Sequence, residues 1–206
     1  RRVVVVRPGL VSGRKLVQTA AELFPVSSLA ELFPPPVRFY WAELARGGLV
    51  SAYQDASRMG ADRWHAMYGA WLHHKRGFAV VDAGSAVTVD YGNCHGQRLG
   101  GYILPGLQMM LRSLRTDAAR IWFDPEQVLS TGPGKSTGEC VNHGLAWLSA
   151  AMTERIRSDA RTSGLTDVLV TGGDADRLIG LGLPGIHQPD LVLQGLHAID
   201  VEESGS

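Results

Sequence analysis

The order of apolar and polar residues predicts short buried strands that alternate with amphipathic helices. Val3 to Val6 is an apolar run stopped by Pro8-Gly9, as expected of a buried strand. From Lys15 to Phe24 the apolar residues have helical spacing, so we expect a helix there. A second helix is expected from Asp62 to Arg76, with apolar residues on one face. The triple proline at 34–36 predicts an extended connector between these two regions.

The middle and the end of the chain repeat this alternation. Strands are expected at Phe78–Val81, Val87–Tyr91, Leu99–Leu104 and Val168–Val170, and helices near 106–115, near 137–157 and after Pro189-Asp190. Strand hairpins that alternate with helices indicate an α/β protein.

The segment Thr131-Gly-Pro-Gly-Lys-Ser-Thr137 is similar to the end of a nucleotide-binding P-loop. The full pattern G-x-x-x-x-G-K-[ST] requires a glycine at position 129, which is Leu129 here. Ser136 and Glu139 instead have the spacing of a capping box, so Ser136 should begin a helix. Its inward stripe is expected to contain Val141, Leu145, Leu148, Met152 and Ile156. Lys135 is then most simply a solvated loop lysine.

Composition excludes several classes of function. The 206 residues can bury one sizeable core or two small ones. Twenty basic residues balance twenty acidic ones, so no net field recruits nucleic acid or an anionic membrane. No apolar run approaches the roughly 18 residues that a membrane-spanning helix needs. Two cysteines give no disulfide framework and fit a reducing cytosol, so we expect a cytoplasmic protein.

Two glycine turns that follow apolar strands are candidate phosphate-binding sites. In the first, Asp82 ends a strand and Gly84 to Ala86 form a turn small enough for backbone N–H groups to approach a phosphate. In the second, Thr171 to Asp174 lie between a strand and a helix, whose N-terminus favours anions. The alternatives are a plain hairpin and a tight connector, and the presence of both turns favours nucleotide binding.

Asp62 and Arg63 at the start of a predicted helix are candidates for acceptor chemistry. Asp62 suits a helix N-cap, but it also suits a general base, with Arg63 holding an anionic substrate. A zinc site has little support, since Cys140 and His143 have no second ligand pair at zinc spacing.

Five segments together resemble the type III pantothenate kinases in order and spacing, over about Tyr53 to Leu196. They read GADRW, VVDAGSAVTVD, GGYILPGLQMMLRSL, GPGKSTGECVNHG and TGGDA. The resemblance implies the fold of the acetate kinase/actin/hexokinase superfamily, with two ribonuclease-H-like lobes around a cleft. We expect the remainder of the first lobe at 1–76 and the second at 77–206. It also implies a homodimer that uses ATP to phosphorylate the 4′-hydroxyl of pantothenate, the first step of coenzyme A synthesis.

The resemblance also assigns roles to individual residues. On the acceptor side Asp62 is similar to the general base, and the implied substrate contacts are Tyr53, Gly60, Ala61, Asp62, Arg63 and Thr137. On the nucleotide side, the implied ATP contacts are Gly84, Ser85, Gly172 and Gly173. Asp82 is similar to the ligand of a monovalent cation, K⁺ or NH₄⁺, and the family also requires Mg²⁺. Ser85 replaces the usual threonine, and either hydroxyl can donate the same hydrogen bond.

One family motif does not occur in the sequence. Family members begin with a strand and turn that read Asp-x-Gly-Asn-Ser/Thr, which cradles the ATP phosphates. We therefore expect a truncated chain with an incomplete first lobe and little or no kinase activity by itself. One alternative is a non-catalytic regulatory or ligand-binding member, of the Bvg accessory factor type. Another is a phosphotransferase of the same superfamily with a different acceptor.

Overall fold

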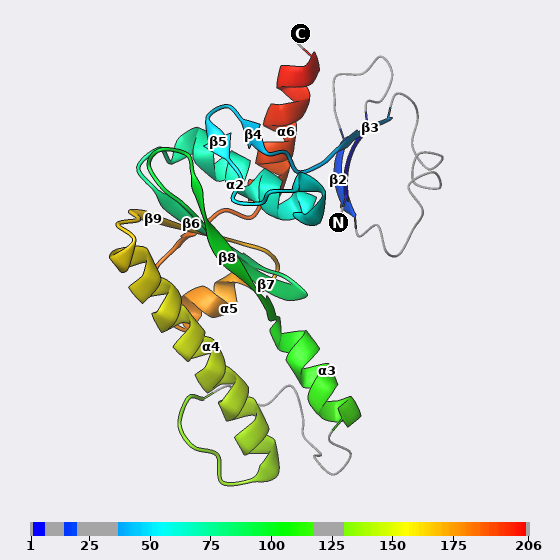
Figure 1. Ribbon diagram of the computed structural model, residues 1–206. Helices are drawn as coiled ribbons and strands as arrows, with labels where there is room; N and C mark the ends of the chain where they lie inside the picture. Colours follow the sequence, from blue (N-terminus) through cyan, green and yellow to red (C-terminus); the bar gives the residue numbers. More distant parts are fainter. Residues whose placement is uncertain (1, 7–14, 20–36, 118–129, 205–206) are drawn as a thin grey trace. The chain divides into compact units, whose positions relative to one another are not determined.

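The computed structural model describes residues 2–6, 15–19, 37–117 and 130–204 (Figure 1). They form two compact units. The first comprises Arg1–Phe78, Gly92–Gly100 and Asp190–Ser206, and the second comprises Ala79–Tyr91 and Gly101–Pro189. The first unit thus includes the C-terminal segment as well as the N-terminal one. The predicted division into lobes at 76/77 stays a prediction.

The second unit is built on a five-stranded sheet in the order β10-β9-β6-β7-β8 (Figure 1). Its strands are β6 (Phe78–Ala83), β7 (Ala86–Gly92), β8 (Arg98–Pro105), β9 (Asp167–Thr171) and β10 (Ile186–His187). The consecutive strands β6, β7 and β8 are neighbours, whereas β9 and β10 pair in parallel. The four predicted strands of this region are confirmed. The sheet places the ends of β6 and β9 beside each other, where both predicted glycine turns begin.

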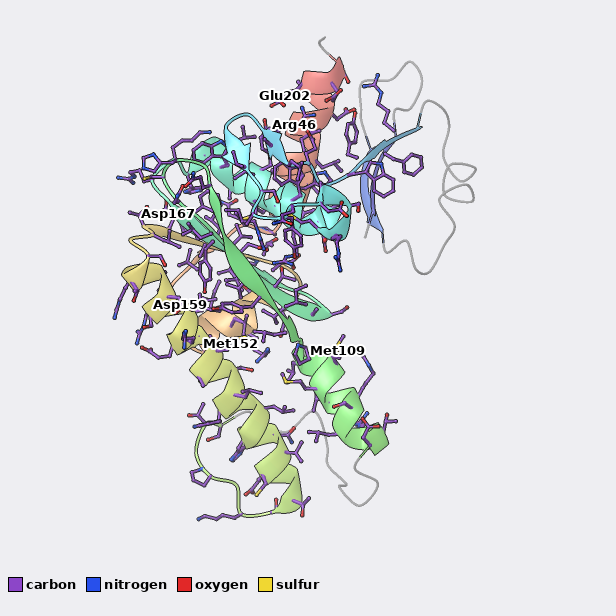
Figure 2. All side chains as sticks on the ribbon, viewed as in Figure 1. Arg46, Met109, Met152, Asp159, Asp167 and Glu202 are labelled. Carbon is purple, nitrogen blue, oxygen red and sulfur yellow. The ribbon has the colours of Figure 1, made fainter. Side chains whose placement is uncertain are left out.

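Three helices accompany this sheet: α3 (Leu107–Asp117), α4 (Thr137–Thr162) and α5 (Ala175–Gly180). The core contains apolar residues of β6 and β7 together with Ile156 of α4 and Leu178 of α5. Tyr91 of β7 donates a hydrogen bond to Asp159 of α4 (3.3 Å; Asp159 is labelled in Figure 2).

The inward stripe predicted for α4 is partly wrong. Leu145 and Ile156 are buried as expected, but the side chain of Leu148 is 47% exposed. The buried face instead includes polar residues, among them Ser149 and Thr153. Their hydroxyls donate to carbonyls one turn earlier, so burial leaves no donor unsatisfied there. An apolar residue at helical spacing is therefore not sufficient evidence of burial.

In the first unit, helix α2 (Ala61–His73) packs against helix α6 (Leu191–Ser204). Every residue of α2 from Ala61 to Trp71 is buried, so the single apolar face predicted for this helix is too narrow. Two glycines allow the close approach: a Cβ at Gly69 would lie 2.7 Å from the Leu191 carbonyl oxygen, and a Cβ at Gly195 would overlap the His65 carbonyl. The hairpin of β4 (Ala45–Arg46) and β5 (Leu49–Val50) turns through Gly47 and Gly48 at φ 53° and 85°.

The N-terminal strands form a separate antiparallel sheet in the order β2-β1-β3. They are β1 (Arg2–Val6), β2 (Lys15–Thr19) and β3 (Val37–Tyr40), with Val4 opposite both Val17 and Phe39. The helix predicted at Lys15–Phe24 is therefore wrong for residues 15–19, since pairing with β1 overrides a short helical pattern that contains the β-branched Val17 and Thr19. Residues 20–24 and the triple proline lie outside the described residues.

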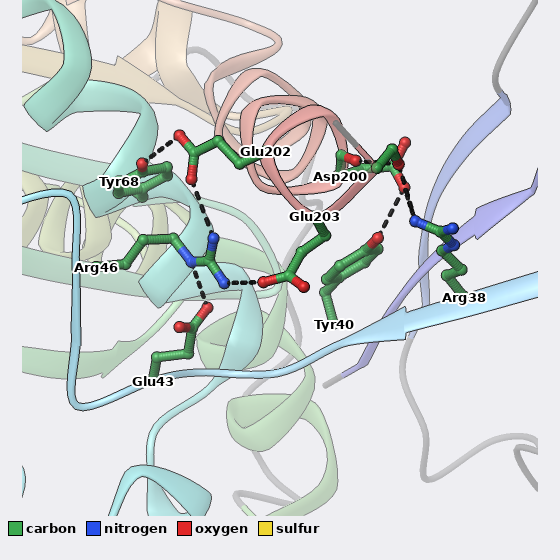
Figure 3. A network of polar contacts seen from close by, with 9 residues as sticks. Arg38, Tyr40, Glu43, Arg46, Tyr68, Asp200, Glu202 and Glu203 are labelled. Carbon is green, nitrogen blue, oxygen red and sulfur yellow. Dashed lines mark hydrogen bonds and ion pairs between the residues drawn. The ribbon is translucent and has the colours of Figure 1, made fainter. Parts of the chain in front are cut away.

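A network of charged and phenolic side chains connects α6 to the β3–β5 region (Figure 3). Arg46 contacts Glu43 (2.7 Å), Glu202 (3.0 Å) and Glu203 (2.5 Å), and the Tyr68 hydroxyl donates to Glu202 at 2.6 Å. Burial alone would lower the pKa of Arg46, but the three carboxylates raise it above its ordinary value. Tyr40 and Arg38 likewise contact the C-terminal helix at Asp200 and Ser204. Within the described residues, no helix has the length and hydrophobicity to cross a membrane.

Candidate functional site

The predicted base, Asp62, lies in the first turn of α2 and is only 4% exposed. Gly60, rather than Asp62, is the N-cap residue of this helix, so the alternative role proposed for Asp62 is wrong. Asp62 instead turns back over Gly60: a Cβ at Gly60 would lie 2.6 Å from Asp62 Oδ1. A glycine at this position therefore gives the carboxylate the space that it occupies.

Tyr53, Arg63 and Arg98 form a cation-rich cluster next to this helix start in the first unit. Arg63 donates to the Tyr53 hydroxyl (3.3 Å), and the Arg98 guanidinium lies 5.0 Å from the centre of the Tyr53 ring. Both arginines are less than a tenth exposed. Two of the predicted acceptor residues, Tyr53 and Arg63, are thus in contact, and their role in substrate binding stays a prediction. The structure adds Arg98, which the sequence did not single out because an arginine at the start of a strand is ordinarily solvated.

His65 is another residue that the sequence did not single out. It lies one helical turn after Asp62 and is fully buried, and neither ring nitrogen has a hydrogen-bond partner within the described residues. Burial lowers its pKa to about 4, so the imidazole is neutral at physiological pH. A buried neutral histidine contributes no charge to the acceptor cluster.

The first predicted phosphate turn lies in the second unit, where Gly84 and Ser85 connect β6 to β7. Gly84 N–H donates to Ala86 (3.1 Å), which closes the turn. The start of α3 supports it from outside: Gly106 N–H donates to the Ser85 carbonyl at 3.1 Å, and a Cβ at Gly106 would lie 2.6 Å from both turn carbonyls. Gly106 is thus a further site residue, and the Pro105-Gly106 pair was its only signal in the sequence.

The second predicted turn lies against the first. Gly172 has φ 92°, and a Cβ there would lie 2.5 Å from the Ala83 carbonyl oxygen and 2.6 Å from Asp82 Oδ1. Asp174 N–H donates to the same Ala83 carbonyl at 2.9 Å. The end of β6, with Asp82, is therefore enclosed by backbone from two turns. Small turns beside a carboxylate can admit a phosphate and its counter-cation together.

The start of α4 is capped as the sequence predicts. Ser136 Oγ accepts from Glu139 N–H (3.2 Å), and the Glu139 carboxylate accepts from Lys135 N–H at 2.6 Å. The return bond thus reaches the residue before the N-cap. Thr137, the implied substrate contact, is the first residue of the helix and is exposed, as is Lys135. Thr137 lies in the second unit, together with both glycine turns.

Across the described residues, no three His, Cys, Asp or Glu side chains are grouped so that they could hold a metal ion. Asp82 as the ligand of a monovalent cation stays a prediction. Its carboxylate is a ligand of the kind that hard cations prefer.

Three known proteins that are similar to this chain in sequence carry the same name. A family model described as type III pantothenate kinase matches residues 12–159. A protein of Marinobacter nauticus named type III pantothenate kinase is 56% identical over 190 residues, which cover 90% of this chain and 78% of that protein. Proteins with the same name from Alcanivorax borkumensis and Cellvibrio japonicus are both 38% identical, over 164 and 172 residues respectively. Those matches cover 78% and 82% of this chain, and 66% and 68% of the relatives.

A solved structure from Campylobacter jejuni, described as a Baf family transcriptional activator, superimposes with a TM-score of 0.53 at 24% identity. The match covers 75% of this chain and 68% of that one. This likeness shows a shared fold alone, and it confirms the predicted α/β fold class. The family model and the sequence identities extend the evidence from fold to family: the chain belongs to the type III pantothenate kinases.

Proposed function

We propose that the protein transfers the γ-phosphate of ATP to the 4′-hydroxyl of pantothenate, the first step of coenzyme A synthesis. The observation that carries this proposal is the contact of the two glycine turns at Asp82. Phosphoryl transfer depends mainly on positioning and on neutralising charge, and backbone donors beside a carboxylate that can hold a cation supply both.

On the nucleotide side, the Gly84-Ser85 turn binds phosphate oxygens through the Ser85 N–H and the Ser85 hydroxyl. The Gly172-Gly173 turn lies beside the adenosine. Asp82 holds the monovalent cation, K⁺ or NH₄⁺, whose charge offsets that of the phosphates. Mg²⁺ bound to ATP would supply charge neutralisation at the transferring phosphoryl group. The contact between Gly172 and Asp82 supports this arrangement, because it brings the adenosine turn to the cation ligand.

On the acceptor side, Asp62 takes the proton of the attacking hydroxyl. Its near-complete burial supports this role, since a carboxylate away from bulk water keeps a defined direction. Arg63 and Tyr53, with Gly60 and Ala61 of the same loop, bind the acceptor, and guanidinium groups suit the carboxylate of pantothenate. Thr137 adds a hydroxyl contact to the substrate.

We also propose that the protein acts as a homodimer in the cytoplasm. Exposed apolar side chains of the second unit support an interface between copies: Ile103 is 64% exposed, Trp147 61% and Leu148 47%. The two cysteines, Cys94 and Cys140, are free and exposed, which suits a reducing compartment.

Pantothenate-dependent release of ADP tests the proposed activity. The assay compares this chain with a chimera that carries the N-terminal segment of the Marinobacter nauticus relative, each with Mg²⁺ and K⁺. We expect turnover in the chimera and a loss of turnover when Na⁺ replaces K⁺. Absence of turnover from the chimera with both cations present would contradict the proposal. Calorimetry separates the alternative, because a non-catalytic member would bind pantothenate without any response to ATP.

A further inference from the structure

We infer that Arg177 is a positioning residue that holds the Gly172–Asp174 turn in the form that receives ATP. This inference rests on the proposed function for the identity of the ligand. The role of the Arg177 side chain is argued from its own contacts. No motif in the sequence indicates Arg177, which follows the turn on the short helix α5.

Arg177 forms a fork-shaped contact with the last residue of the turn. Its Nε donates to both carboxylate oxygens of Asp174 (3.0 and 2.8 Å), and Nη2 lies 2.6 Å from Asp174 Oδ2. Two nitrogens of one guanidinium therefore hold one carboxylate, which fixes its orientation as well as its position.

The third nitrogen of the guanidinium anchors this pair to α4. Arg177 Nη1 donates to Ser149 Oγ at 3.0 Å. Ser149 is 2% exposed, and its own hydroxyl proton is directed to the Leu145 carbonyl (2.8 Å), so the oxygen is free to accept. The anchor is thus a buried serine on a helix of 26 residues.

The turn consequently has two attachments inside the second unit. Asp174 N–H binds the Ala83 carbonyl of β6, and the Asp174 carboxylate binds Arg177 and through it α4. Helix α5 spans only six residues, and a helix of that length contributes little to its own stability. The side-chain anchor therefore supplies order that the helix lacks.

The surroundings strengthen the anchor. Arg177 and Ser149 line a pocket of about 120 Å³ whose other walls are mainly apolar, including Leu104, Met110 and Met152 (Figure 2 labels Met152). An ionic hydrogen bond beside apolar walls is stronger than one in open water. Loss of Arg177 would leave the Asp174 carboxylate without its fork and would allow Gly172 to move away from Asp82.

The test compares Arg177→Met, Arg177→Lys and Ser149→Ala with a matched control, Arg155→Met. The control removes an arginine–carboxylate pair from the exposed side of α4, where Arg155 is 2.8 Å from Asp159. Two quantities are measured, on this chain and on the chimera described above: deuterium exchange of the Asp174 amide, and the dissociation constant of ATP by calorimetry. The dissociation constant of pantothenate is also measured, because loss of the Arg177 contacts should leave it unchanged.

For Arg177→Met we expect faster exchange at Asp174 and ATP binding weakened about tenfold, with pantothenate affinity unchanged. Arg177→Lys should recover part of the loss, and Ser149→Ala should show a smaller one. Unchanged exchange at Asp174 overturns the inference, as does equal weakening of ATP and pantothenate binding. If neither the unsubstituted chain nor the chimera binds ATP, the proposed function fails, and the exchange measurement still decides whether Arg177 holds the turn.

Discussion

Gly172 lies directly against Asp82: a single methyl group on Gly172 would stand 2.6 Å from the carboxylate oxygen Oδ1. Asp82 lies near the end of β6 and Gly172 follows β9, so the two residues are far apart in the sequence but belong to neighbouring strands and their turns. Because the carboxylate fills the space of a side chain, glycine is required for steric reasons as well as for its φ of 92°.

Gly172→Ala should therefore weaken both the fold and ATP binding. The positive φ costs about 1–2 kcal/mol for a residue with a Cβ, and displacement of Asp82 adds to that cost. Gly182→Ala is the matched control, since Gly182 has φ 97° but no atom within 4 Å of its ideal Cβ. Chemical denaturation and calorimetry with ATP measure the two effects. Equal losses of stability and equal ATP affinities in the two variants would contradict a steric role for Gly172.

The sequence predicted both glycine turns but not the contact between them. The apolar runs that form β6 and β9 and the small residues after them are local patterns, and they identified both turns. That Gly172 meets Asp82 depends on strand order, which places β9 beside β6, and no local pattern encodes it. The family resemblance placed both turns on the nucleotide side, but it did not indicate that Gly172 contacts Asp82.

The residues that the sequence missed are polar side chains whose environment is set by packing. Arg98, His65 and Arg177 would be solvated by default. Arg98 and His65 are buried and Arg177 is partly buried because of the elements that cover them. The error at Lys15–Thr19 has a similar origin, since pairing with β1 decided the conformation of a segment whose local pattern was ambiguous.

Asp62→Asn should abolish phosphoryl transfer while ATP binding stays unchanged. The substitution keeps the size of the side chain but removes the acceptor of the proton, and general-base catalysis contributes about 10²–10⁴-fold in rate. The rate of ADP release in the chimera described above, with calorimetry for ATP, measures the change. Asp55→Asn is the control, because Asp55 is exposed and an asparagine can still accept the Ser57 N–H bond. Full activity of Asp62→Asn would remove Asp62 as the base.

His65 should make the fold less stable as the pH falls from 6.5 to 4. Its pKa in the folded protein is about 4, against 6.5 when unfolded, so between these values the unfolded chain binds a proton that the folded chain does not. Above pH 6.5 the ionisation of His65 therefore does not reduce the free energy of unfolding. As the pH falls from 6.5 to 4, that free energy decreases by up to about 3 kcal/mol.

The comparison of His65→Met with the unsubstituted chain isolates this contribution. The free energy of unfolding, measured by urea denaturation across this pH range, should change less steeply in the variant, since methionine does not titrate. His73→Met serves as the control, because His73 is exposed near the end of the same helix and should leave the slope unchanged. Parallel pH profiles for His65→Met and the unsubstituted chain would show that His65 does not titrate as its burial requires.

Trp147 and Leu148 of α4 should contribute to the homodimer. About half or more of each side chain is exposed. Strand β8 lies at the edge of its sheet, and its Tyr102 and Ile103 are exposed as well. Trp147→Glu places a charge on this surface without removing a core contact, so the folded monomer should persist while association weakens. Sedimentation velocity should show the mass of the substituted protein fall to that of one chain. Leu44→Glu, a similar change at an apolar side chain of the first unit that is 50% exposed, should leave the dimer intact. A dimer that survives Trp147→Glu but dissociates in Leu44→Glu would place the interface on the first unit instead.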